Sequence, residues 1–179
     1  MRFVFAALLA SFLVGCTSAP VTTPREYLDE QTAATITAVK EPWIFTREQN
    51  VANGQRDFIH LYAIDVNRMG NHQQYIAALW SSAGDSALRP ILELTAGGQT
   101  RRLQASTQSP REIGIAQPIA QSYTLTSAWW FFPVDKPTLA ELANERNLRA
   151  QLIVGNERIA YALWRDGRDE LSELTAVLP

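Results

Sequence analysis

Two histidines and three nearby aspartates are the side chains of this chain that could hold a metal ion. His60 and His72 are the only histidines, and Asp57, Asp65 and Asp85 could complete a site with them. Their spacing matches no familiar metal motif. The simpler interpretation, which we favour, places His60 on the face of a sheet with its hydrogen bonds made, and His72 in a loop. We therefore expect no metal and no other cofactor.

A serine could act as a nucleophile in the segment Gly84-Asp85-Ser86, which resembles the nucleophile block of the Gly-Asp-Ser esterases. The resemblance implies a histidine partner in an Asp-x-x-His arrangement near the C-terminus. Both histidines precede Ser86, and residues 87–179 contain none. The chain therefore departs from that family at the group that would accept the serine proton.

Carboxylates that are close in sequence are the remaining candidates for acid–base chemistry. Asp29 with Glu30, and Asp166 with Asp169, are two such pairs. A glycosidase needs two carboxyl groups about 5 to 9.5 Å apart across a cleft, which linear spacing does not establish. We interpret both pairs as solvated loop or helix charges, and we predict no catalytic residues.

The strongest candidate for binding is an aromatic run, Trp129, Trp130, Phe131 and Phe132. On a strand, the first and third of these point to one face and the second and fourth to the other. An exposed pair would form a patch suited to a protein partner, a glycan ring or a lipid. If both faces are covered, the run belongs to the core, and the sequence leaves both interpretations open.

The only cysteine, Cys16, ends an apolar run that follows Arg2. Residues 3–14 are too few to cross a bilayer, which takes about twenty, and are typical of a processing signal. Residues 13–16, Leu-Val-Gly-Cys, resemble the lipobox of bacterial lipoprotein signal peptides. The resemblance implies that residues 1–15 are removed as the signal peptide, and that Cys16 gains a diacylglyceryl group on its thiol and a third chain, commonly palmitate, on its amino group.

Two or more acyl chains hold a protein firmly on a membrane. Thr17 stands where an aspartate commonly signals retention in the inner membrane, so the resemblance implies an outer-membrane lipoprotein that faces the periplasm. Residues 17–24 are small, polar and proline-bearing, so residues 16–24 are expected to form a lipidated N-terminus and tether. Residues 25–179 then form one domain.

Composition limits the partners of that domain. The formal net charge of −2 argues against nucleic acid, which calls for a basic field. With 46% hydrophobic and 19% charged residues, the chain can build a core. Acylation of Cys16 would leave no thiol for a disulfide, so packing must stabilise the domain.

Alternation of apolar and polar residues, broken by turn signals such as Asn53-Gly54, predicts a strand-rich domain. Pro42 indicates a bulge or an edge, and residues 57–67 suit a central strand because both faces are apolar. We expect a charged edge strand at 99–105 and a loop at 106–121. The expected strands are 34–40, 43–46, 57–67, 74–81, 91–95, 99–105, 122–133, 149–154 and 158–164, and the expected helices are 135–147 and 171–178.

Many short antiparallel strands with brief helices predict an immunoglobulin-like β-sandwich, or alternatively a small β-barrel. Together with the leader, this predicts a membrane-anchored lipoprotein of the cell envelope whose domain binds or scaffolds an envelope protein or glycan, without catalysis. Two alternatives stay open. One is an envelope hydrolase built from dispersed acidic residues, and the other is a carrier of lipid or another hydrophobic ligand inside a closed barrel.

Overall fold

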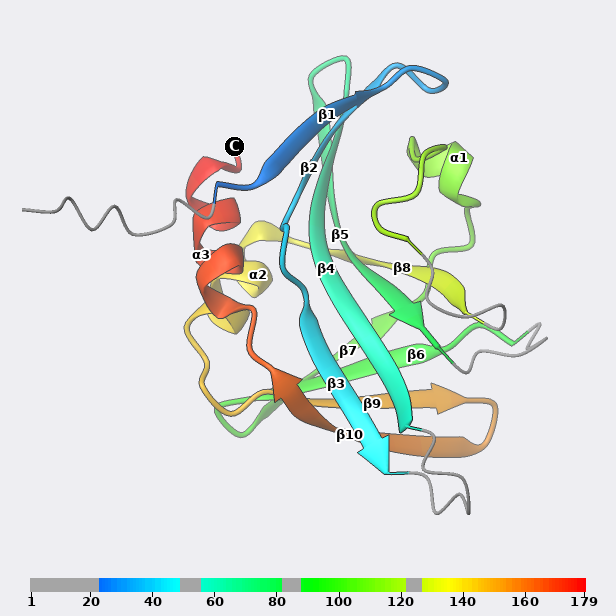
Figure 1. Cartoon of the computed structure of the whole chain (residues 1–179), viewed down its shortest axis with the longest axis vertical. Helices are drawn as coiled ribbons and strands as arrows, with labels where there is room; N and C mark the ends of the chain where they lie inside the picture. Colours follow the sequence, from blue (N-terminus) through cyan, green and yellow to red (C-terminus); the bar gives the residue numbers. More distant parts are fainter. Residues whose placement is uncertain (1–22, 49–55, 82–87, 122–126) are drawn as a thin grey trace, which may run out of the picture.

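A computed structural model of the chain describes residues 23–48, 56–81, 88–121 and 127–179. These residues form ten antiparallel strands and three short helices (Figure 1). The predicted mostly-β fold is therefore confirmed. The elements are β1 (Arg25–Asp29), β2 (Ala34–Ala38), β3 (Trp43–Glu48), β4 (Arg56–Arg68), β5 (Asn71–Trp80), β6 (Ile91–Ala96), β7 (Gln99–Gln104), α1 (Pro110–Ile113), β8 (Ala128–Val134), α2 (Lys136–Ala143), β9 (Arg149–Val154), β10 (Glu157–Arg165) and α3 (Arg168–Val177).

The long strand β4 organises the first layer of the sheet. It pairs with β5 along one side, while β2 and β3 share its other side, one after the other. Pro42 lies in the break between them, because a residue without an N–H cannot continue the ladder. The prediction that residues 57–67 form a central strand is confirmed, and both faces of β4 carry buried side chains.

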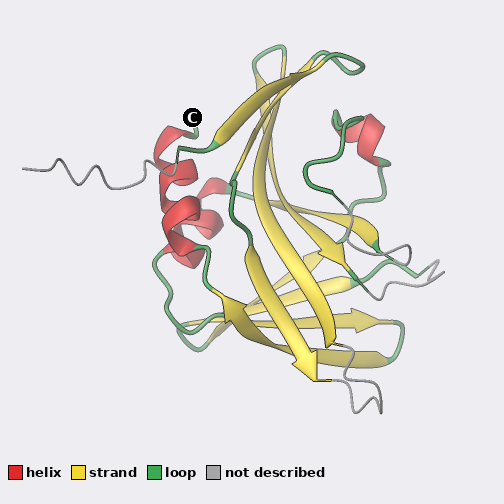
Figure 2. Ribbon diagram, viewed as in Figure 1, coloured by secondary structure: helices red, strands yellow, loops and turns green. Residues whose placement is uncertain are grey.

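Strand β10 joins the first layer to the second. Its first half pairs with β9, from Glu157 to Tyr161, and its second half pairs with β3, from Ala162 to Arg165. Beyond β9 come β6 and β7, and β7 is the charged edge strand that we predicted. The sheet is not closed into a barrel, and its two layers are consistent with a β-sandwich (Figure 2).

The core lies between these layers and is completed by α2 and α3. Asp135 caps α2 by accepting a hydrogen bond from the Thr138 N–H at 3.0 Å. Leu139 and Leu142 of α2 and Leu174 of α3 are buried in the core. The largest fully buried side chains are those of Phe45, Phe132, Ile36, Ile59, Leu61, Ile64, Ile76, Leu79, Leu92, Leu94, Ile113 and Leu139.

One carboxylate differs from its predicted role as a solvated charge. Asp29 is fully buried at the end of β1, a strand that we did not predict. Its oxygens accept hydrogen bonds from the backbone N–H groups of Gln31, Thr32, Ala116 and Gln117 at 2.6–3.2 Å. The solvated-charge interpretation is therefore wrong for Asp29, whose carboxylate holds the segment after α1 against the β1–β2 hairpin.

Candidate functional site

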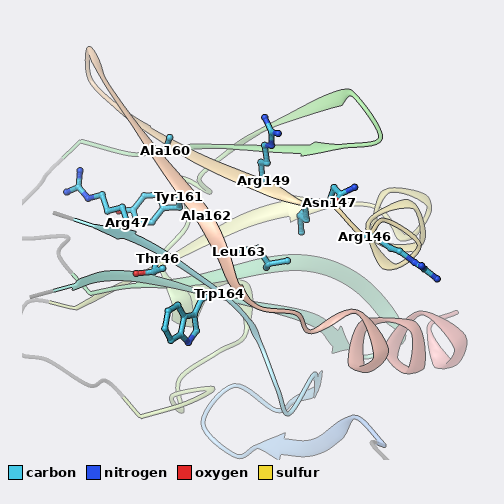
Figure 3. Close-up of a pocket in the computed structure, with 11 residues that line it drawn as sticks. Thr46, Arg47, Arg146, Asn147, Arg149, Ala160, Tyr161, Ala162, Leu163 and Trp164 are labelled. Atoms are coloured by element: carbon cyan, nitrogen blue, oxygen red, sulfur yellow. The ribbon is translucent and has the colours of Figure 1, made fainter. Parts of the chain in front are cut away.

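An open groove of about 800 Å³ lies where β10 leaves β9 and joins β3 (Figure 3). The pairing of β10 with β9 ends at Tyr161, and residues 146–148 lead towards α2 instead of continuing alongside β10. Three segments therefore surround the groove: the end of β3, residues 146–149, and the middle of β10. Its lining residues are Thr46, Arg47, Arg146, Asn147, Leu148, Arg149, Ala160, Tyr161, Ala162, Leu163 and Trp164.

A buried carboxylate on β4 holds two of the side chains that line this groove. The Asp57 side chain is 0% exposed and accepts hydrogen bonds from Arg47 Nε at 2.8 Å and from the Tyr161 hydroxyl at 2.5 Å. Ser81 Oγ and Trp80 Nε1 also donate to it, at 3.0 and 3.4 Å. A charge taken out of water is stable only with such partners, so Asp57 holds the Arg47 and Tyr161 side chains in fixed positions.

Arg47 and Tyr161 also lie against each other, with the guanidinium carbon 5.7 Å from the ring centroid (Figure 3). Burial, and after it the hydrogen bond to Asp57, raise the pKa of Tyr161 well above its usual range. The phenol is therefore a neutral donor that points at Asp57. Because Asp57 uses only the Nε of Arg47, both Nη atoms of that guanidinium remain available to a ligand.

A β-bulge displays the one tryptophan of the groove. On β10, Leu163 pairs with Phe45 and Arg165 pairs with Ile44, so Trp164 is the extra residue between them. A bulge of this kind redirects a side chain, and Trp164 is 59% exposed. The Arg56 guanidinium carbon lies 4.9 Å from its ring centroid, a cation–π contact that orients the indole.

The groove is positively charged. Arg146 and Arg149 are exposed, and neither guanidinium makes a hydrogen bond or an ion pair with the residues that the structure describes. No acidic side chain is among the residues that line the groove. Glu145 is adjacent in sequence, but its carboxylate accepts the Arg146 backbone N–H and it lines another hollow, beside Gly97.

The aromatic run lies on β8, and its side chains alternate between the two faces of the sheet. Phe131 and Phe132 are buried, while Trp129 and Trp130 are half-buried. Trp129 contacts Tyr62 with ring centroids 5.7 Å apart. Side chains on both faces of β8 are thus at least half-buried, and a binding role for these four residues stays a prediction.

Trp129 and Phe131 do line a small apolar pocket of about 190 Å³. The segment around α1 forms its other wall, through Pro110, Ile115 and Ile119. The pocket is large enough for one side chain or a short alkyl group, and it lies apart from the groove beside β10. Cys16 and the segment Gly84-Asp85-Ser86, by contrast, lie outside the described residues.

The two histidines lie far apart on the sheet. His60 on β4 is opposite Leu79, whereas His72 on β5 is opposite Asn67 near the other end of the ladder. Burial lowers the pKa of His60. Within the described part of the chain, no three His, Cys, Asp or Glu side chains are grouped so that they could hold a metal ion.

His72 lies on a strand rather than in the expected loop, and it has a buried partner. Its Nδ1 is 2.7 Å from a carboxylate oxygen of Asp65, and Gln74 Nε2 donates to the other oxygen at 2.7 Å. Both Asp65 and His72 were candidates for a metal site in the sequence. The structure places them together as a hydrogen-bonded pair beside a second open groove.

Sequence reasoning missed the groove beside β10. Its arginines come from two separate segments, and no local motif unites Arg47 with Arg146 and Arg149. One signal was present: Asp57 begins an expected strand whose next two residues, Phe58 and Ile59, are apolar, and a buried charge requires a partner. That partner could not be named without the register of β3, β4 and β10.

Comparisons of the chain with known protein families, curated proteins and solved structures gave no match. None of the helices in the described residues is long and apolar enough to cross a bilayer.

Proposed function

We propose that this protein is a lipid-anchored lipoprotein of the bacterial cell envelope, on the periplasmic side of the outer membrane, whose domain binds a ligand in the groove beside β10 without catalysis. The observation that carries the binding function is an open groove in which two side chains, Arg47 and Trp164, are already held in place. Arg47 is held by a buried carboxylate, Trp164 is displayed on a bulge, and two further arginines have no partner in the described chain. Side chains fixed before binding lose less entropy when a ligand arrives.

Photo-crosslinking in intact cells tests the binding function. Benzoylphenylalanine would replace Ala162, an exposed groove residue whose side chain is small, and in a matched control it would replace Val177, which is also exposed but lies on α3. We expect a discrete crosslinked species from position 162 that is missing from position 177. No crosslink from position 162, or the same products from both positions, would overturn the proposal.

The anchor rests on the lipobox resemblance and is tested separately. Metabolic labelling with an alkyne fatty acid should label the wild-type protein, and the Cys16→Ser variant should lose the label and leave the membrane fraction. Mass spectrometry of the mature N-terminal peptide should find acyl chains on Cys16. An unmodified Cys16 thiol would remove the localisation while leaving the binding function intact.

One observation favours the alternative of an envelope hydrolase. Asp65 orients His72 through Nδ1, which is the arrangement that prepares an imidazole to accept a proton at Nε2. A hydrolase of this kind should lose at least about 100-fold in activity in a His72→Asn variant that keeps its fold. A panel of ester and glycoside substrates that shows no His72-dependent turnover would exclude this candidate.

A further inference from the structure

The charge of the groove indicates the chemistry of its ligand. Arg47 offers its Nη atoms from a fixed position, and Arg146 and Arg149 are unpaired in the described chain. A guanidinium presents its donors as a planar fork that matches the two oxygens of a carboxylate or phosphate. Because the whole chain has a formal net charge of −2, this local excess of positive charge is a property of the groove and not of the surface in general.

The groove also offers a flat ring. Trp164 is exposed on its bulge, while Arg56 lies against the ring and orients it. The C–H groups of a sugar ring pack well on the face of an indole, whose surface carries a partial negative charge. Trp164 lies on the other side of β10 from Arg146 and Arg149, but all three line the same groove (Figure 3). The groove therefore suits an extended ligand that carries both rings and negative charges.

We propose that the groove beside β10 binds a negatively charged glycan, an inference that rests on the binding function proposed above. Trp164 stacks on one sugar ring, and the arginines contact carboxylate or phosphate groups on that ring and its neighbours. Arg146 and Arg149 are three residues apart, so their Cα atoms are separated by at most about 11 Å. Charges on successive rings of one chain can reach both of them.

The shape of the groove argues against a membrane surface as the ligand. Basic segments that bind anionic lipid headgroups usually carry four to eight Lys or Arg residues on one accessible face. Here only three arginines line the groove. Arginines elsewhere on the surface form ion pairs, such as Arg101 with Glu141 and Arg165 with Glu41. The unpaired charge is thus concentrated in one groove and not spread over a flat face.

Titration calorimetry with oligosaccharides of defined charge tests the inference. The protein would be purified in detergent as cells produce it. The charged probes are hexagalacturonate, with one carboxylate per ring, and phosphorylated maltohexaose, and the neutral probe is maltohexaose. We expect at least one charged probe to bind at least about tenfold more tightly than the neutral one, with affinity falling as salt rises.

The variant Arg146→Gln/Arg149→Gln should weaken that binding at least about tenfold, because each arginine supplies charge-assisted hydrogen bonds. Neither side chain has a structural partner in the described residues, so the variant should unfold at the wild-type temperature. Arg111→Gln is the matched control, since Arg111 is an exposed arginine on α1 that does not line the groove. It should leave the affinity unchanged.

Three outcomes would overturn the inference: no binding of either charged oligosaccharide, equal binding of the neutral one, or equal affinity in the double variant. Phosphatidylglycerol vesicles and a hexaglutamate peptide serve as further probes. If only one of these binds, and the double variant abolishes that binding, the ligand is a lipid surface or an acidic protein segment instead. A crosslink from position 162 together with no glycan binding would leave the proposed function standing and remove this inference alone.

Discussion

At the scale of single residues, Asp57 connects the stability of the fold to the shape of the groove. Its carboxylate lies on β4, yet its partners come from β3, β5 and β10 and from Ser81 beyond β5. These partners tie β4 to three other strands of the sheet. A single buried charge thereby sets the positions of two groove residues, Arg47 and Tyr161, that are distant in sequence.

Replacing Asp57 with alanine should therefore be costly. The Asp57→Ala variant leaves Arg47 and the Tyr161 hydroxyl without their acceptor, and we expect the free energy of unfolding to fall by about 3–5 kcal/mol. Urea denaturation measures this directly. Asp166→Ala, which breaks a more exposed pair with Arg168, should cost less than about 1 kcal/mol. Equal losses in the two variants would contradict the central role of Asp57.

Asp29 should make stability depend on pH. Burial alone would raise its pKa, but the hydrogen bonds from four backbone N–H groups outweigh burial and hold the pKa of Asp29 below its ordinary value of 3.8. Its stabilisation is therefore complete above pH 3.8 and is lost as the pH falls through the lowered folded pKa. Thermal melts below pH 4 should show a loss of stability that is smaller in Asp29→Asn. An identical pH profile for the two proteins would contradict this assignment.

At the scale of elements, the sequence predicted most strands because each alternates apolar and polar residues between clear turn signals. The hairpin of β9 and β10 is an example. The strand β1 escaped prediction because its residues are mostly exposed and Leu28 points outwards. α1 escaped because four residues are too short for a helical period.

The candidate site was beyond sequence reasoning for a different reason. A run of neighbours such as Trp129 to Phe132 is visible in one dimension, whereas the groove depends on how β10 changes partners. That change follows from packing of the whole sheet. The bulge at Trp164 likewise adds one residue to a strand whose alternation, from Ile159 to Leu163, looks regular in the sequence.

Gly114 shows how closely the segment after α1 packs on the sheet. Its φ of +105° is one that other residues rarely adopt, and an added Cβ would come within 2.9 Å of Val66 Cγ1 and 3.1 Å of Ala34 Cβ. Gly114→Ala should lower the free energy of unfolding by about 2–4 kcal/mol, through backbone strain and overpacking together. Gly98→Ala is the matched control, because Gly98 has a φ of +80° with open space around it. In Gly98→Ala the free energy of unfolding should fall by about 1–2 kcal/mol, through backbone strain alone. An equal loss in both variants would rule out the packing contribution at Gly114.

At the scale of the whole molecule, β10 links the two layers of the sheet, so we expect them to unfold together. Each layer shares this strand, so separating the layers breaks pairing with either β9 or β3. We expect chemical unfolding to follow one transition, with circular dichroism and tryptophan fluorescence changing together. Two resolved transitions would show that the β6–β7–β9 layer unfolds without the rest.

The position of β1 has a mechanical consequence. If residues 16–24 link the fold to a lipid, tension from the membrane enters the domain at Arg25 and runs along β1 to the Asp29 carboxylate. The backbone N–H groups of Ala116 and Gln117, which are distant in sequence, donate hydrogen bonds to this carboxylate. These bonds carry part of the force, so a larger force is needed to separate the β1–β2 hairpin from the sheet. Optical-trap pulling from the N-terminus should require more force for the wild type than for Asp29→Asn. The hydrogen bonds of Asp29 would then keep a force on the lipid anchor from distorting the ligand groove.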